Sequence, residues 1–309
     1  MKLKLQLINQ AHSIIYNNKK YKDEFKFLLP FRVSDKYITF QHCLIALQDY
    51  PFEVKDSTFY SLVDIITELR DYDMYKLDTT KSVLSKRIKH FLEEYSTGTH
   101  IYLQEVIGIL KNISPNSCLV GGSVRDICNL QNKRCNIKDF DFVTDANYEH
   151  LGQALQKDGF RIDETGQQFL VLRCTKEDET YEIACYRKDN TYKDGRRPES
   201  VDIGDIFTDS ERRDFTVNSL YYDLNKEVIL DPTGMGVDDA INRTLRFNGN
   251  PHLRINEDYL RVFRAYRFIS KGYTAEPRTL NSIRSNFEIS LRNTDHNRIR
   301  QEIERMVGL

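Results

Sequence analysis

The sequence of 309 residues has no run of about 18 apolar residues that could cross a membrane. It begins with no continuous apolar segment and no small-residue cleavage site. The six cysteines include no C-x-x-C pair and no neighbouring His at zinc-ligand spacing, so they indicate free thiols in a reducing compartment. These absences favour a soluble protein of the cytoplasm that has no membrane partner.

A large charge of one sign is also lacking, because 45 Lys and Arg residues balance 46 Asp and Glu residues. A nucleic-acid partner would therefore need a local basic patch. What the sequence does contain is apolar mass: 40% of its residues are hydrophobic, and 18 Tyr and 17 Phe can build cores. The length exceeds that of one average domain and predicts two or three units.

The hydrophobic periodicity changes twice along the chain. Residues 3–95 place apolar residues three and four apart, which predicts helices, and the segment 96–100 (STGTH) is typical of a linker. Strand-like runs and turns follow a helix at about 101–113, and from about Asn256 the pattern is helical again. We therefore predict an α+β protein with a helical N-terminal extension of unknown role (1–97), a mixed-sheet head (98–245) and a helical neck (246–309).

A pair of glycines, Gly121 and Gly122, ends a short apolar strand in the segment LVGGSVRD and precedes a predicted helix that starts near Ser123. Glycines let backbone amides approach an anion, and the end of the helix adds its dipole, so the segment can cradle a phosphate. An ordinary tight turn between strand and helix explains the same pattern equally well.

Two carboxylates flank one phenylalanine in the segment Asp139-Phe140-Asp141. On a strand, both acids would lie on one face while Phe140 and Phe142 pack on the other. Like charges that close favour a divalent cation between them, and oxygen ligands suit Mg²⁺ that bridges to phosphates. A solvated strand face is the alternative, but a nearby phosphate cradle favours a phosphoryl-transfer site.

The segment RRDFTVNS brings together two cations, a carboxylate and an amide: Arg212, Arg213, Asp214 and Asn218. Arginine suits phosphate oxygens, and Asp or Asn suits ribose hydroxyls. Surface ion pairing is an equally good interpretation of this segment alone. The later segment DPTGMGVDD, residues 231–239, is interpreted as a structural turn.

A helix predicted over residues 257–268 places Asp258, Arg261 and Arg264 on one arc and apolar residues on the other. A carboxylate can accept from an exocyclic amine while a guanidinium donates to a ring acceptor. That pair would accept cytosine and adenine and refuse uracil and guanine. A solvated face with an Asp–Arg pair is the competing interpretation.

In combination these motifs resemble those of class II tRNA nucleotidyltransferases (CCA-adding enzymes) and bacterial poly(A) polymerases. The matching stretches follow the family's order over about residues 101–270: LVGGSVRD, DFDFVTD, GRRP, RRDFTVNSL, DPTGMGVDD with LRFNG, and RINEDYLRVFRAYRF. The resemblance implies a palm-like head and an enzyme that transfers CMP and AMP from CTP and ATP to the 3′ end of tRNA without a template. It also implies a two-metal mechanism with Mg²⁺.

The resemblance also implies a role for each matching residue. Asp139 and Asp141 match the metal-binding catalytic carboxylates, and Asp258 with Arg261 matches the pair that reads the base. Glu182 is a candidate third carboxylate, and residues 187–199 resemble a flexible segment that helps the pocket change from C to A. The expected nucleotide-binding residues are Gly121, Gly122, Arg125, Arg213, Asp214, Asn218, Asp258, Arg261 and Arg264.

The sequence also departs from the family. Members usually continue into a long helical body and tail that grip the tRNA, whereas this sequence ends at Leu309 after a segment that only loosely resembles the family's ERIxxE helix. We expect the RNA-holding parts to be missing or relocated. The extension 1–97 could bind tRNA, a partner chain or a second copy.

Three other functions stay open on the sequence. A poly(A) polymerase uses the same chemistry, although Gly166-Gln167-Gln168-Phe169 lacks the basic pair that marks many such enzymes. A toxin or defence factor could modify tRNA ends. A catalytically inactive RNA-binding protein on the same fold is a remoter alternative, because both acids are present.

Overall fold

The computed structural model describes residues 78–96, 98, 100–129, 137, 139–163, 165–189 and 200–307. Leu77–Asp231 and Gly236–Leu309 form one compact unit. The other unit, Met1–Lys76 with Pro232–Met235, is described only at the turn Pro232–Met235. The helices predicted before residue 78 and the GRRP segment therefore lie outside the described residues.

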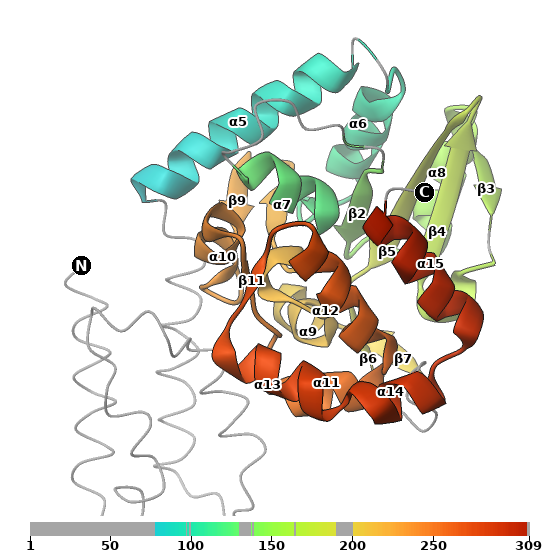
Figure 1. The fold of residues 1–309 in the computed structure, drawn as a ribbon. Coiled ribbons are helices and arrows are strands. Elements are labelled where there is room, and N and C mark those ends of the chain that lie inside the picture. The colour runs from blue at the N-terminus through green and yellow to red at the C-terminus, as the bar shows by residue number, and fades with distance from the viewer. Residues whose placement is uncertain are drawn as a thin grey trace, which may run out of the picture. The chain divides into compact units, whose positions relative to one another are not determined.

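A seven-stranded mixed sheet forms the centre of the described unit (Figure 1). Its order is β3-β4-β5-β2-β1-β8-β9. The strands are β1 (Cys118–Val120), β2 (Asp141–Thr144), β3 (Arg161–Asp163), β4 (Val171–Lys176), β5 (Glu179–Cys185), β8 (Tyr221–Asp223) and β9 (Val228–Leu230). Strand β2 runs parallel to β5, and the other neighbours are antiparallel. The predicted α+β fold with a mixed sheet is confirmed.

Helices cover this sheet and continue beyond it. They are α5 (Thr79–Ser96), α6 (Leu103–Ile113), α7 (Gly122–Cys128), α8 (Tyr148–Lys157), α9 (Ile206–Arg212), α10 (Gly236–Asn242), α11 (Pro251–Glu257), α12 (Leu260–Ser270), α13 (Pro277–Ser285), α14 (Phe287–Asn293) and α15 (His296–Val307). Two small strand pairs complete the fold: β6 (Arg187–Asp189) with β7 (Val201–Ile203), and β10 (Thr244–Leu245) with β11 (Thr274–Ala275).

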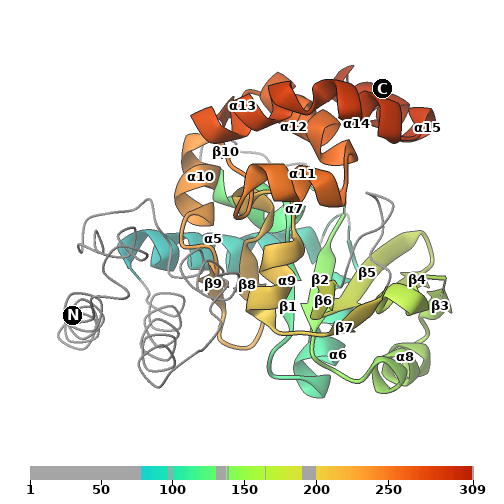
Figure 2. The same ribbon diagram turned by 90° about the horizontal axis from the view of Figure 1, so that it is seen from below.

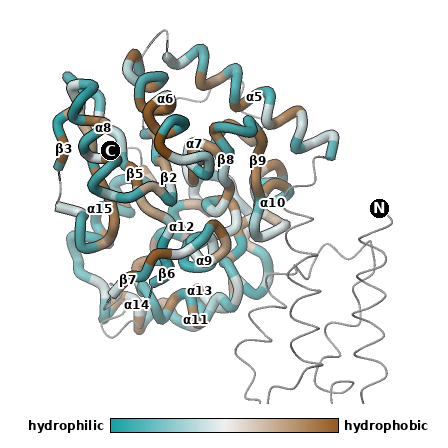
Figure 3. Tube along the Cα trace, turned by 180° about the vertical axis from the view of Figure 1, so that it is seen from behind, coloured by the Kyte–Doolittle hydropathy of each residue, from teal (hydrophilic) through white to brown (hydrophobic). Residues whose placement is uncertain are grey.

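Helix α5 belongs to the same core as the sheet. Its residues Leu84, Ile88 and Leu92 recur every four positions and are all buried in the main apolar cluster. Figure 3 shows the corresponding alternation of hydrophilic and hydrophobic residues along this helix. The Ser85 hydroxyl oxygen also accepts a hydrogen bond from the Ile229 amide of β9, at 3.0 Å. The boundary expected near residue 97 therefore does not separate α5 from the head.

The C-terminal helices α11 to α15 lie together beside the sheet-bearing part (Figure 2). Helix α12 packs against α15 through a small buried cluster of Leu260, Phe263 and Ile299. It also reaches the main core, where the Phe268 ring meets the Phe215 ring at 5.4 Å between centroids. The predicted neck is helical, and it packs into the core of the head within one compact unit.

The described part of the chain holds four of the six cysteines. Cys118, Cys128, Cys174 and Cys185 are free and buried. Burial raises the pKa of the Cys118 thiol to about 12, which keeps that thiol protonated. Among the described helices, none has both the length and the apolar character that a bilayer crossing requires.

Candidate active site

The glycine turn lies directly between the central strand β1 and helix α7. Gly121 has φ 77° and ψ −127°, a backbone conformation that side chains with a Cβ atom rarely adopt, so glycine is required there. A Cβ atom built on Gly121 would lie 3.7 Å from Nη1 of Arg213, which places that guanidinium against the turn. The helix expected near Ser123 begins at Gly122.

The two acids alternate with two phenylalanines, as strand geometry requires. Asp139 and Asp141 are exposed, whereas Phe140 and Phe142 are each 1% exposed. Asp141 stands opposite Val120 in β1, the residue before Gly121, and opposite Glu182 in the parallel strand β5. The sheet register therefore brings one carboxylate next to the glycine turn.

The charge around Asp141 is poorly balanced. Removal from bulk water, followed by the negative charge of Glu182, raises the pKa of Asp141 to about 6, and Asp139 adds to this rise. The positive charge of Arg213 opposes it. The Asp141 side chain reaches solvent, yet protein atoms surround it on most sides. Arg213 is therefore close enough to lower the pKa of Asp141, and its Nη1 also lies against the glycine turn.

Asp139 and Asp141 fit a shared divalent cation. Within the described residues, neither carboxylate accepts a hydrogen bond or forms an ion pair, so their oxygens are available as ligands. Glu182 is different, because its carboxylate is paired with Arg173 on strand β4. No group of three or more metal-binding side chains occurs in the described ranges. Phosphate and water can supply further oxygen ligands.

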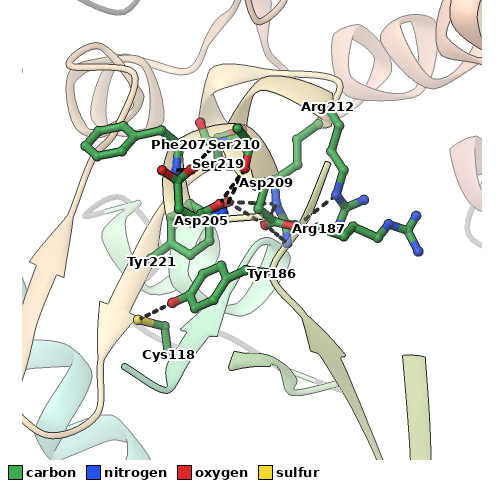
Figure 4. A network of polar contacts seen from close by, with 12 residues as sticks. Cys118, Tyr186, Arg187, Asp205, Phe207, Asp209, Ser210, Arg212, Ser219 and Tyr221 are labelled. Atoms are coloured by element: carbon green, nitrogen blue, oxygen red, sulfur yellow. Dashed lines mark hydrogen bonds and ion pairs between the residues drawn. The ribbon is translucent and has the colours of Figure 1, made fainter. Parts of the chain in front are cut away.

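Arg213 is held by a buried acid on helix α9. Its Nε donates to Oδ2 of Asp209 at 3.0 Å and to the Tyr221 hydroxyl at 3.1 Å. Arg212 donates to the other oxygen, from Nε to Oδ1 at 2.9 Å, and Tyr221 donates to Oδ2 at 2.7 Å. Figure 4 shows Asp209, Arg212 and Tyr221 of this network. Asp209 is completely buried, and a buried charge needs a partner of opposite sign. The guanidinium groups of Arg212 and Arg213 supply that charge.

A second network joins the glycine-turn helix to the neck. Arg125 on α7 donates through Nη1 to Oδ1 of Asn218, and the Asn218 amide donates to Oδ1 of Asp214 at 2.8 Å. Arg264 on α12 donates through Nε to Oδ2 of Asp214 at 2.7 Å. Burial raises the pKa of Asp214, but Arg264 and Asn218 outweigh it and hold the value at about 2. The structure therefore brings these four predicted site residues together.

Arg261 lies elsewhere than the sequence analysis predicted. Its side chain is buried rather than on a charged exposed face, and its guanidinium donates to the carbonyls of Arg254 and Arg212 and to the Glu257 carboxylate, each at 2.7 Å. The helix expected over 257–268 is interrupted, because α11 ends at Glu257 and α12 begins at Leu260. In this structure Arg261 anchors the end of α9.

Asp258 is likewise engaged by a residue that the sequence analysis did not single out. Arg298 on α15 contacts both carboxylate oxygens, from Nη1 to Oδ1 at 3.3 Å and from Nη2 to Oδ2 at 3.1 Å. Asp258 and Arg261 share one backbone hydrogen bond, from the Arg261 amide to the Asp258 carbonyl, but their side chains have different partners. The Asp258–Arg261 ion pair of the competing interpretation is therefore not present, and base reading stays a prediction.

Several supporting residues were missed at the sequence level. Asp209 precedes Arg212 and Arg213 by three and four positions, a spacing that favours ion pairs on one helix face, so the sequence did carry this signal. Asn248 and Arg298 act over 35 and 40 positions and carried no such signal. The segment 231–239, interpreted as a turn, is a turn only to Met235, because α10 begins at Gly236.

The comparisons with known proteins agree with this fold. Residues 117–246 match the family model described as the poly(A) polymerase head domain. The CCA-adding enzyme of Enterococcus faecalis is 39% identical over 166 residues, which are 53% of this chain and 38% of that protein. The structure of the Bacillus stearothermophilus CCA-adding enzyme in complex with CTP is similar, with a TM-score of 0.56 and 28% identity over 66% of this chain and 48% of that one.

A further similar structure is that of a tRNA nucleotidyltransferase complexed with a primer tRNA and an incoming ATP analogue, with a TM-score of 0.52 and 26% identity over 64% of this chain and 55% of that chain. The mixed sheet and these matches identify a nucleotidyltransferase head. Residues 117–246 are therefore similar to the head domain of poly(A) polymerases and to CCA-adding enzymes. The chain spans less than half the length of the curated relatives that it matches, for example 38% of the Enterococcus protein.

Proposed function

We propose that this protein is a template-independent RNA nucleotidyltransferase that adds CMP and AMP from CTP and ATP to the 3′ end of tRNA. One observation carries the proposal: the Gly121 turn, the Asp141 carboxylate and the Arg213 guanidinium meet at adjoining ends of β1 and β2. That group combines a phosphate cradle, an acid with free oxygens and a cation. These are the parts that phosphoryl transfer needs.

The residues divide the work by their chemistry. Mg²⁺ held by Asp139 and Asp141 would lower the pKa of the RNA 3′-hydroxyl and neutralise charge on the leaving pyrophosphate. Arg213 points Nη1 at the glycine turn, where it can donate to triphosphate oxygens. Gly121 and Gly122 leave space for those oxygens because they have no side chains. No covalent enzyme intermediate is needed.

The choice of tRNA and of CTP with ATP rests on the relatives. One similar structure is described as a complex with CTP, and another as a complex with a primer tRNA and an incoming ATP analogue. We propose the same substrates here. Base reading by Asp258 and Arg261 is part of the proposal. It would require Asp258 to exchange its contact with Arg298 for the incoming base, and Arg261 to release a donor from the Glu257 carboxylate or from a backbone carbonyl.

The test is an extension assay on tRNA that lacks its terminal CCA and on intact tRNA, with each labelled nucleotide in turn. Addition of CMP residues followed by one AMP, each with release of pyrophosphate, supports the proposal. A long tract of A would instead identify a poly(A) polymerase, and extension of an already complete CCA end would identify a factor that blocks tRNA. RNA binding without any incorporation would overturn the enzymatic proposal.

A further inference from the structure

We propose that Asp209 is a positioning residue for the nucleoside triphosphate, which acts by fixing the Arg213 guanidinium so that its Nη1 edge faces the Gly121 turn. The inference rests on the proposed function, because it assigns a phosphate contact to Arg213. Asp209 itself is completely buried and touches no substrate. It therefore acts through Arg213 alone or together with Arg212.

The first step of the argument is the geometry of the guanidinium. Arg213 uses Nε and Nη2 on Asp209, at 3.0 and 2.9 Å to Oδ2. In the described part of the chain, Nη1 donates to no protein group, and it lies 3.7 Å from the position that a Cβ atom on Gly121 would occupy. One edge of the planar group is therefore fixed while the other faces the turn. A planar fork held in this way presents its free donors in one direction.

The second step is the surroundings of Asp209. Its two oxygens accept from Arg212, Arg213 and the Tyr221 hydroxyl, so rotation of the carboxylate would break several hydrogen bonds. The Tyr221 ring also lies under the Arg213 guanidinium, at 5.4 Å from its central carbon to the ring centroid. Tyr186 stands beside Tyr221, at 6.4 Å between ring centroids (Figure 4). The orientation of the Asp209 carboxylate is therefore fixed, and its contacts with Nε and Nη2 fix the orientation of the Arg213 guanidinium.

The third step concerns charge. Burial alone raises the pKa of Asp209, yet Arg213 and Arg212 overcome that effect and lower it to about 2. Asp209 is therefore a full negative charge at neutral pH and a strong acceptor for both guanidinium groups. In Asp209→Asn, an NH₂ group would replace one of the two accepting oxygens and would face an arginine N–H, so one of these hydrogen bonds would be lost. The Arg213 side chain would then lose the partner that sets its direction.

The loop that carries Arg213 has other anchors, so it can persist without Asp209. Asn248 donates to the Ser210 carbonyl at 2.8 Å, Arg254 donates to the Glu211 carbonyl at 2.6 Å, and Arg261 donates to the Arg212 carbonyl at 2.7 Å. These contacts satisfy carbonyls in the last turn of α9 from three separate residues. A change at Asp209 should disturb the direction of the side chain more than the path of the backbone.

The experiment compares Asp209→Asn with Asp239→Asn in the full chain. Asp239 is a matched control, because it is also a buried acid that holds an arginine, Arg246, at 3.0 Å, and this arginine lies near Glu276 rather than at the glycine turn. Both variants should unfold at lower urea concentration. The KM for CTP should rise about tenfold in Asp209→Asn, because the phosphate contact of Arg213 is weakened, and it should change little in Asp239→Asn. A tenfold change corresponds to about 1.4 kcal/mol of binding free energy.

A double-variant comparison separates positioning from general damage. Arg213→Gln should raise the KM for CTP, and adding Asp209→Asn to it should change the KM little further, because the group that Asp209 positions is already gone. Asp209→Glu should recover part of the loss. Equal KM values in Asp209→Asn and Asp239→Asn, with an active wild-type protein, would overturn this inference and leave the proposed function intact. A wild-type chain that incorporates no nucleotide would remove the proposed function itself.

Discussion

Arg264 and Asp214 form an ion pair of 2.6 Å, from Nη2 to Oδ2, that joins the neck helix α12 to the loop that follows α9. Asp214 is 7% exposed, and it also accepts from the Asn218 side chain and the Phe215 amide. Because Asn218 in turn contacts Arg125 on α7, an unbroken chain of polar contacts connects the neck to the helix that follows the glycine turn. The position of the neck and that of the turn are therefore coupled.

Loss of the Arg264 side chain should destabilise the protein. Arg264→Ala leaves the buried Asp214 charge without its main partner, which costs about 3–5 kcal/mol in fully buried pairs. We expect about 2 kcal/mol, because the Arg264 side chain keeps 30% of its surface exposed. Urea unfolding at neutral pH measures the effect. Arg292→Ala on α14 is the control, since its pair with Glu288 is exposed and should contribute little.

The same variant has a predicted pH dependence. The pKa of Asp214 is held at about 2, below the ordinary value of 3.8, so the ionised form stabilises the folded protein above that ordinary value. This contribution is lost as the pH falls from about 4 to about 2. The difference in unfolding free energy between wild type and Arg264→Ala should therefore shrink in acid. A constant difference over that range would contradict the assignment.

Asp141 should behave in the opposite way. Its pKa is raised to about 6, so the folded protein binds this proton more tightly than the unfolded chain does. The ionised carboxylate then destabilises the metal-free protein above about pH 6, and this effect disappears as the pH falls toward 4. Asp141→Asn should raise the unfolding temperature at about pH 8 and not at about pH 4.5. Added Mg²⁺ should stabilise the wild type and leave the variant unchanged.

Removal of either acid should abolish catalysis. Asp139→Ala and Asp141→Ala each take away a ligand for the proposed cation, and we expect incorporation to fall by at least about a thousandfold while RNA binding survives. Filter binding of labelled tRNA and the extension assay measure the two properties. Asp163→Ala, on the edge strand β3 of the same sheet, should leave both unchanged. Full activity in Asp141→Ala would remove the metal assignment.

The two glycines of the turn should respond differently to the same change. Gly121 has a positive φ of 77°, so Gly121→Ala should destabilise the protein by about 1–2 kcal/mol. Gly122 lies in the first turn of α7, where a Cβ atom would meet Arg125 Nη2 at an ordinary 3.5 Å. Gly122→Ala should therefore be neutral or stabilise by about 0.5 kcal/mol. Urea unfolding of the two variants side by side decides the point.

Replacement of Asp258 should affect the choice of nucleotide more than the binding of RNA. Asp258→Ala removes the acceptor that we propose for an exocyclic amine, so incorporation of UMP and GMP should rise relative to CMP and AMP, by about tenfold. Competition assays with all four nucleotides measure this ratio. An equal loss for every nucleotide would show that Asp258 supports the fold through Arg298 and does not read the base.

Local patterns in the sequence were enough to predict much of the head. The apolar run that ends in Gly121 and Gly122 predicted the strand and the turn, and the alternation of Asp141 with Phe142 predicted which side chains face solvent. These features depend on neighbours within a few positions. Strand alternation and the conformational freedom of glycine are local properties, so they survive in the folded chain.

The partners of the charged residues could not be predicted in the same way. A helical projection placed Asp258 and Arg261 on one face, but α11 ends at Glu257, before both of them, and α12 begins only at Leu260. Arg261 turns inward and donates to the carbonyls of Arg212 and Arg254. Arg298 reaches Asp258 from 40 positions away. Such pairs depend on how helices pack, and a carboxylate in the sequence carries no sign of which distant arginine will reach it.

The contact between α5 and β9 determines where the catalytic part can be cut free. A shortened protein that starts at residue 98 would lose the apolar residues Leu84, Ile88 and Leu92 that cover the sheet. It would also leave the Ile229 amide without its Ser85 acceptor in an interior position. Such a fragment should aggregate when expressed, whereas one that starts at Asp78 should stay in solution. The eighteen residues of α5 therefore belong in any fragment that is meant to contain the folded head.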